Sequence, residues 1–180
     1  MVKPLLIFYL SFAVKLLLSQ NIQTVQNIDS GWQFKKLNDH YWLPAKVPGT
    51  VHTDLIANGI IEDPYYRINE KKIQWIDKKD WLYETTFNLD EASFNRENHE
   101  LHFEGLDTYA TIYLNDNRIL KCDNMHRTYT VNVKPYLIEG KNVLLILLES
   151  PIRKGLALYD SLDYILPVSA NDQAEIGEVP

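Results

Sequence analysis

Cysteine, methionine and glycine are scarce in this chain of 180 residues, with one, two and seven copies. The single cysteine, Cys122, excludes a disulfide within the chain. The few glycines form no phosphate-binding loop of the Walker or dinucleotide type, and no Gly-x-Ser-x-Gly nucleophile elbow occurs. Asn-x-Ser/Thr is also absent, so we expect no N-linked glycan. These absences remove nucleotide-binding enzymes and serine hydrolases of that type from consideration.

An excess of positive charge is missing as well, since the formal net charge is −6. Nucleic acid and anionic membranes would repel such a chain, so neither is an expected partner. A content of 46% hydrophobic and 23% charged residues indicates a folded protein, and the length fits one domain. Four Trp and eleven Tyr could form a core or stack on sugars, and composition does not choose between the two.

The first twenty residues differ from the rest of the chain. A basic start at Lys3 precedes an apolar run over 4–18, and the small residue Ser19 follows. This order is typical of a secretory signal peptide, which we predict at 1–19, leaving 20–180 as the mature chain without a membrane span. Lys15 interrupts the apolar run and argues against a spanning helix, although a retained membrane anchor is the rival interpretation.

The next segment contains one expected helix. After a short strand predicted at 32–34, Pro48-Gly49 breaks the chain and Thr50 can serve as a helix N-cap. Gly59 suits the C-terminal end, so the pattern predicts a helix over about 51–58. Residues 62–80 show no clean period and are predicted to form a long loop, which in a compact domain is usually functional or packed against something.

From residue 81 the chain alternates apolar and polar residues over short stretches. Strands are predicted at 81–89, 100–103, 109–114, 118–120 and 129–133, with a hairpin turn at 115–117. Residues 142–150 are apolar at nearly every position and predict a central strand buried on both faces. Residues 151–180 show no strong period. The fold class is therefore all-β, a β-sandwich or jelly roll with one short helix.

Three carboxylates stand among these strands, namely Glu104, Asp107 and Asp116. Glycosidases use paired carboxylates about 5–9.5 Å apart, and the first two are about 10 Å apart in an extended strand. Asp107 lies at a strand junction and Asp116 in a turn, where such residues bond the backbone. We interpret all three as scaffold rather than catalytic. The five His do not show metal-ligand spacing, so no metal site is expected.

Several stretches together carry a family resemblance: "VPGTVHTDL" (47–55), "DPYYRINE" (63–70), "WLYETTF" (81–87) and "FEGLDTYATIYLN" (103–115). In this order they resemble the N-terminal part of animal lysosomal β-mannosidases, members of glycoside hydrolase family 2. The resemblance covers nearly all of the chain after residue 20. It implies a galactose-binding-domain-like jelly roll, followed in the family by immunoglobulin-like domains and a (β/α)₈ barrel.

In that family the barrel carries two catalytic Glu and hydrolyses terminal non-reducing β-D-mannose residues from oligosaccharides with retention, without a cofactor. The resemblance therefore implies that no catalytic residue lies in this chain. It also implies that the chain's partners are the missing C-terminal domains, including the barrel, and a mannose-containing oligosaccharide. The family's Trp-Asp-Trp-Gly motif is absent here, and "YILPVSANDQAEIGEVP" (164–180) corresponds to its approach. The expected domain over 20–180 is accordingly incomplete.

The loop over 63–75 is the predicted site region, substrate-proximal or at a domain interface. Its candidates combine flat apolar faces with polar tips and are Tyr65, Tyr66, Arg67, Asn69 and Trp75. Packing of the aromatic rings into the jelly roll's own core is the alternative. Asn69 is the best single candidate to approach a sugar.

Two further classes of function stay open from the sequence. One is a secreted non-catalytic carbohydrate-binding module, and the other is a secreted interaction protein, such as a pseudoenzyme. The predicted location is the secretory pathway, with the lysosome as destination and secretion from the cell as the alternative.

Overall fold

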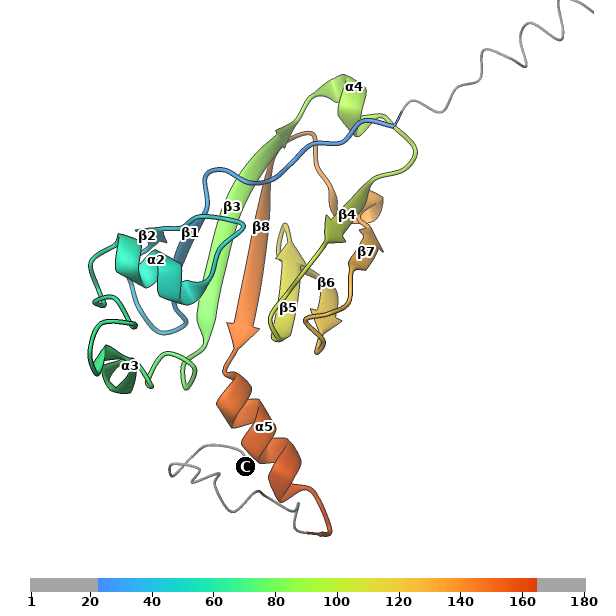
Figure 1. Ribbon diagram of the computed structural model, residues 1–180. Coiled ribbons are helices and arrows are strands. Elements are labelled where there is room, and N and C mark those ends of the chain that lie inside the picture. The colour runs from blue at the N-terminus through green and yellow to red at the C-terminus, as the bar shows by residue number, and fades with distance from the viewer. Residues whose placement is uncertain (1–22, 165–180) are drawn as a thin grey trace, which may run out of the picture.

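A computed structural model of the chain describes residues 23–164 (Figure 1). Its strands are β1 (Gln33–Lys36), β2 (Leu43–Pro44), β3 (Trp81–Leu89), β4 (Glu100–Phe103), β5 (Tyr109–Leu114), β6 (Asn117–Cys122), β7 (Tyr129–Asn132) and β8 (Gly140–Glu149). Its helices are α2 (Val51–Ala57), α3 (Asn69–Lys72), α4 (Glu91–Phe94), the 3₁₀ turn η1 (Lys134–Tyr136) and α5 (Pro151–Asp160). Among these described residues, no helix has the length and apolar character needed to cross a membrane.

The strands form two antiparallel sheets. The larger sheet has six strands in the order β2-β1-β3-β8-β5-β6, and the smaller sheet pairs β4 with β7. The longest ladder joins β3 to β8 and runs from the pair Trp81–Leu148 to the pair Leu89–Gly140. Because β3 and β8 are the central strands, their side chains fix most of the core.

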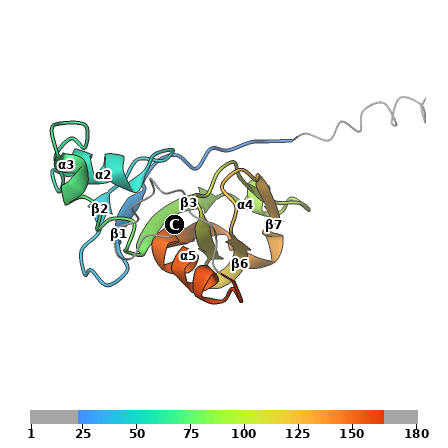
Figure 2. The same ribbon diagram turned by 60° about the horizontal axis from the view of Figure 1, so that its bottom comes forward.

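The two sheets pack face to face over a hydrophobic core, with the small sheet over the β5–β6 end of the large one (Figures 1 and 2). The inner side chains of the large sheet are the most buried, including Phe34, Ile112 and Leu114, which are fully buried. Leu101 and Phe103 of β4 pack against this core from the opposite sheet. The predicted β-sandwich is thus confirmed.

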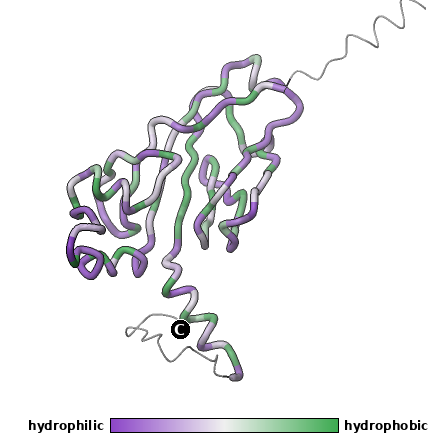
Figure 3. The backbone as a smooth tube through the Cα atoms, viewed as in Figure 1, coloured by the Kyte–Doolittle hydropathy of each residue, from purple (hydrophilic) through white to green (hydrophobic). Residues whose placement is uncertain are grey.

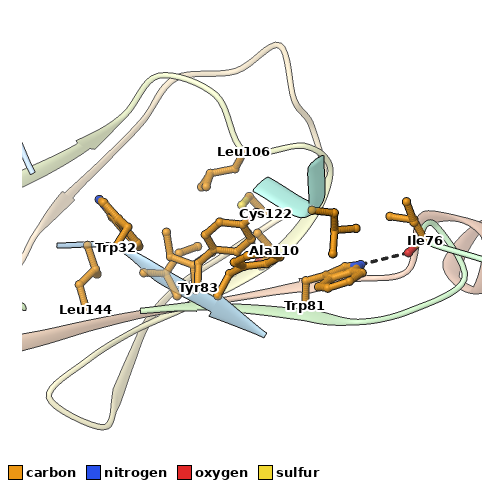
Figure 4. Close-up of a cluster of buried hydrophobic side chains, with 12 residues drawn as sticks. Trp32, Ile76, Trp81, Tyr83, Leu106, Ala110, Cys122 and Leu144 are labelled. Carbon is orange, nitrogen blue, oxygen red and sulfur yellow. Dashed lines mark hydrogen bonds between the residues drawn. The ribbon is translucent and has the colours of Figure 1, made fainter. Parts of the chain in front are cut away.

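Aromatic rings fill the other end of the core, under α2 and the loop that follows it (Figure 4). Phe34 stacks between Trp81 and Tyr83 at centroid distances of 5.9 and 5.5 Å. The indole N–H of Trp81 donates to the carbonyl oxygen of Ile76 at 3.0 Å, so the ring buries no unpaired polar atom.

The predicted helix is confirmed as α2 with the expected cap. Thr50 and Thr53 form a reciprocal capping box, in which each side chain accepts from the other residue's backbone N–H. Gly59 follows with φ +68°, a conformation that favours glycine. Three other helical segments, α3, α4 and α5, were not predicted.

Helix α5 falls in the stretch after residue 150, where the sequence showed no strong period and no element was predicted. Ser150 accepts from the backbone N–H of Arg153 and Pro151 occupies the first turn, an arrangement that initiates helices. The signal was present in the sequence as Ser-Pro. Helix α5 extends away from the end of the sheets in Figure 1.

Strand β8 is central, as predicted, but the prediction of burial on both faces is wrong. Leu144 and Ile146 are buried, whereas Val143, Leu145 and Leu147 on the opposite face are half-buried. Figure 3 shows the middle of the strand as hydrophobic. The described part of the chain therefore covers only one face of the large sheet.

Candidate functional site

The three carboxylates considered from the sequence do not form a site. Glu104, Asp107 and Asp116 are all exposed, and Asp116 lies in the β5–β6 turn with φ +64°. The carboxylate of Asp107 accepts a hydrogen bond from the neighbouring hydroxyl of Thr108. Their exposure and local bonding agree with a scaffold role.

The loop over 63–75 is a folded unit organised by Asp63. The Asp63 carboxylate accepts from the backbone N–H of Tyr65 at 2.9 Å, and its carbonyl oxygen accepts from the N–H of Tyr66 at 3.1 Å. An ion pair between Glu62 and Lys72, 3.3 Å apart, joins the two ends of the segment. The short helix α3 then turns the chain back toward the core.

The five predicted site residues divide into two groups. Tyr65 and Tyr66 are exposed, with 96% and 58% of their surface accessible, and the Arg67 guanidinium lies 5.0 Å from the Tyr66 ring. Asn69 is only 5% exposed, and its amide donates to the carbonyl oxygen of Asp63 at 3.0 Å. Trp75 packs against the core, 6.0 Å from the ring of Trp81.

The exposed residues, Tyr65 to Arg67, and the more buried residues, Asn69 and Trp75, therefore offer different chemistry. Tyr65, Tyr66 and Arg67 present aromatic and cationic groups that could bind a sugar or another protein surface. Asn69 holds the loop in shape, and Trp75 anchors it to the core. Of the two alternatives considered from the sequence, core packing holds for Trp75, whereas Tyr65 and Tyr66 are exposed.

A buried polar contact outside the loop was missed by the sequence analysis. Asp54 of α2 is 2% exposed and accepts from the hydroxyl of Tyr83 at 2.8 Å and from the backbone N–H of Lys46 at 2.9 Å. Burial, together with the hydrogen bond to Asp54 and its negative charge, raises the pKa of Tyr83 above its ordinary value. This contact joins α2 and the turn before it to strand β3, and so positions the start of the loop.

A shallow polar hollow lies beside the start of β3. Its charged lining residues are Lys36, Asp39, Lys78, Lys79, Asp80 and Arg153. Asp80 receives the Arg153 guanidinium at 2.6 and 2.7 Å, and Asp39 pairs with Lys36 at 3.3 Å. Both carboxylates in the hollow are thus paired with cations.

Two histidines contact polar groups. His99 bonds the carbonyl oxygen of Ser93 at 2.8 Å, whereas His102 bonds the hydroxyl of Thr130 at 2.9 Å and lies 3.4 Å from the carboxylate of Glu100. No group of three His, Cys, Asp or Glu residues within 23–164 could hold a metal ion.

The fold and the site together define a class. The molecule is an antiparallel β-sandwich with one helix-covered end. Residues 32–177 match the family model "Glycosyl hydrolase 2 galactose-binding domain-like". The chain belongs to this family.

Similar proteins are β-mannosidases. The β-mannosidase of Capra hircus is 37% identical over 128 residues, which cover 70% of this chain and 14% of that protein. β-Mannosidase B of Aspergillus terreus is 38% identical over 124 residues, covering 66% and 15%. The crystal structure of a β-D-mannosidase from Dictyoglomus thermophilum matches with a TM-score of 0.77 and 39% identity, covering 79% of this chain and 18% of that one.

The resemblance to β-mannosidases predicted from the sequence is confirmed by these matches. A β-D-glucuronidase from the same bacterium matches at 15% identity with a TM-score of 0.53, which extends the shared fold to a second kind of glycosidase. The chain spans about a seventh of the length of the curated relatives.

Proposed function

We propose that this chain serves as the N-terminal jelly-roll domain of a retaining β-mannosidase, which removes terminal non-reducing β-D-mannose from oligosaccharides. The observation that carries the proposal is the similarity at 37–39% identity to β-mannosidases in both sequence and fold. In this proposal the catalytic carboxylates belong to the family's barrel domain. The domain contributes binding surface and support.

The loop over 63–75 is the part of the domain proposed to face the rest of the enzyme. Tyr65 and Tyr66 expose large apolar ring faces. Exposed apolar surface of this kind marks sites of interaction with another domain, protein or ligand. The Arg67 guanidinium against Tyr66 gives the surface a defined shape with hydrogen-bond donors at its rim. We assign these three residues to a domain interface or to the mouth of the sugar pocket.

The remaining proposals concern processing and location. Residues 1–19 are proposed as a signal peptide and 20–180 as the beginning of the jelly-roll domain. The proposed destination is the lysosome, in keeping with the animal β-mannosidases that the chain is similar to, with secretion as the alternative. Residues 1–22 and 165–180 lie outside the described region, so these proposals rest on sequence alone. The N-terminal residue of the protein made in an animal cell line tests the cleavage site directly.

A domain replacement tests the proposed function. The segment of the Capra hircus enzyme that aligns with this chain is replaced by the aligned residues of this chain, and hydrolysis of 4-nitrophenyl β-mannoside is measured. We expect the chimera to retain activity and the chain alone to have none. A folded chimera without activity, or turnover by the chain alone, would contradict the proposal.

Point variants of the chimera test the loop. Tyr65→Ala is expected to raise KM or lower kcat at unchanged thermal stability, because the side chain is exposed. Tyr41→Ala serves as the control, since Tyr41 is also exposed, at 84%, and lies outside the loop. Equal KM and kcat values for the two variants would contradict a role of the loop in substrate binding.

A non-catalytic carbohydrate-binding module remains the second candidate. Exposed aromatic rings on a β-sandwich are the observation in its favour. Calorimetric binding of mannose-containing oligosaccharides by the chain alone, lost in Tyr65→Ala, would favour this second function.

A further inference from the structure

The outer face of the large sheet is apolar along the middle of β8 and at adjoining positions of β3 and β5. Leu82, Val143, Leu145, Leu147 and Tyr113 are half-buried, and none of them packs against either hydrophobic cluster. In an antiparallel sheet with one face in solvent, apolar side chains that point to the core normally alternate along each strand with polar side chains that point to solvent. Here the middle of the central strand β8 is apolar at successive residues, Val143 to Leu148, and Figure 3 shows this part of the strand as hydrophobic.

One cross-strand row on this face has opposite charges at its two ends. Ladder pairing places Glu84 of β3 beside Leu145 of β8, Leu145 beside Tyr113 of β5, and Tyr113 beside Arg118 of β6. The row therefore reads acidic, apolar, aromatic, basic across four adjacent strands. Glu84 and Arg118 are three strand spacings apart, about 14 Å, which is too far for an ion pair within one chain.

Neither charged group has an opposite charge as partner among residues 23–164. The Glu84 carboxylate accepts one hydrogen bond, from the side-chain amide of Gln33 at 2.9 Å, and is half-buried on the apolar face. Arg118 is exposed at the edge strand. A carboxylate among leucines without a cation is an unfavourable arrangement unless something else supplies the cation.

We propose that this face binds the same face of a second copy of the chain. Consider a two-fold axis that runs parallel to the strands, between β8 and β5. Rotation about it brings β3 of one copy over β6 of the other, and β8 over β5. All four residues of the row lie at one level along the strands. Glu84 of one copy therefore faces Arg118 of the other copy, and the two-fold axis forms the same contact a second time with the copies exchanged.

In the same superposition Leu145 meets the aromatic ring at position 113 of the other copy, and the next row brings Leu147 over the polar, buried Thr111. Sheets that pack face to face keep their strands within about 30° of each other, so the rows stay matched near the axis. In that next row Leu82 of β3 lies over Lys121 of β6, so the match in charge is confined to the row of Glu84 and Arg118. Along that row the surface is complementary to itself, as a two-fold interface requires.

Sedimentation velocity over a concentration series tests the proposal. The full chain is expressed through a eukaryotic secretory pathway, and its N-terminus is checked by mass spectrometry. We expect a reversible dimer. Glu84→Arg and Arg118→Glu should each raise the dimer Kd about tenfold or more, because each creates two like-charge contacts. The double variant, with the charges exchanged, should restore the original Kd.

Rescue by the double variant separates this interface from any other association. Lys71→Glu on α3 reverses a charge far from the row and should leave the Kd unchanged. Leu145→Lys should give a monomer, and circular dichroism checks that it is folded. A chain that is monomeric throughout the series, or a dimer without rescue in the double variant, overturns the proposal. Either result leaves the proposed enzymatic role untouched.

Discussion

The hydroxyl of Tyr83 donates a hydrogen bond of 2.8 Å to the buried carboxylate of Asp54, which lies 29 residues earlier in the chain. The contact links helix α2 to the central strand β3 beneath it. The other carboxylate oxygen of Asp54 accepts from the backbone N–H of Lys46. Helix α2, strand β3 and the turn before the helix therefore meet at the Asp54 side chain.

Removal of the Tyr83 hydroxyl should destabilise the domain. Tyr83→Phe leaves one buried oxygen of Asp54 without its donor, which we expect to lower the free energy of unfolding by about 1–3 kcal/mol. Urea denaturation measures the change. Tyr65→Phe removes a hydroxyl from a ring that is 96% exposed and should change nothing. Equal midpoints for the two variants would contradict a stabilising role for the Asp54–Tyr83 contact.

The same contact predicts a loss of stability in alkaline solution. The pKa of Tyr83 is raised in the folded state from its ordinary value of 10.0, so above pH 10 the unfolded chain releases a proton that the folded chain keeps. The stability that this group contributes is fully present below pH 10 and declines above it, by about 1.4 kcal/mol per pH unit. Tyr83→Phe should show a correspondingly smaller slope. Parallel curves for the two proteins would contradict the assignment.

Asn69→Ala should reduce stability rather than act only on a bound sugar. The amide is buried and donates to the carbonyl oxygen of Asp63, so its loss should cost about 1 kcal/mol or more. Thermal denaturation of the chain checks this. Glu70→Ala, at the exposed neighbouring position, is the matched control. A variant with unchanged melting temperature would instead support a role for Asn69 in the sugar pocket.

Ile146→Asp should prevent stable folding. Ile146 is 8% exposed at the centre of β8, and an unpaired carboxylate there costs several kcal/mol, a large part of a domain's total stability. Ile138→Asp is the control, because that side chain is 51% exposed. Circular dichroism and soluble yield are the measurements, and a normally folded Ile146→Asp protein would show that the strand is not central.

Cys122 should react slowly with alkylating reagents in the folded protein. The thiol is 3% exposed and lies 3.6 Å from the carbonyl oxygen of Ala110, and burial raises its pKa above the ordinary value. Both effects lower the concentration of accessible thiolate. The rate of iodoacetamide labelling in buffer should be far below the rate in denaturant. Equal rates would place the thiol at the surface.

Local sequence patterns were sufficient for most of the strands. The period of two in 81–89 gave both the bounds of β3 and its inward face, because each residue of a strand alternates sides regardless of its distant partners. The inward face of β4 and the bounds of both β4 and β5 were also predicted, and the polar residues at 115–117 marked the turn between β5 and β6. Thr50 and Gly59 likewise marked the ends of α2, since caps satisfy the helix's own backbone groups.

Contacts between segments that are distant in sequence were decided only by the tertiary structure. Nothing local distinguishes the buried Asn69 from an exposed one, or indicates that Asp54 finds a hydroxyl on β3. The period within β8 could not reveal which face is covered, because both faces are apolar and the covering elements come from elsewhere in the chain. Strand order decided that Glu84 and Arg118 stand on one row without touching. Short-range patterns record how a segment satisfies its own backbone, whereas burial and pairing depend on which surface folds against it.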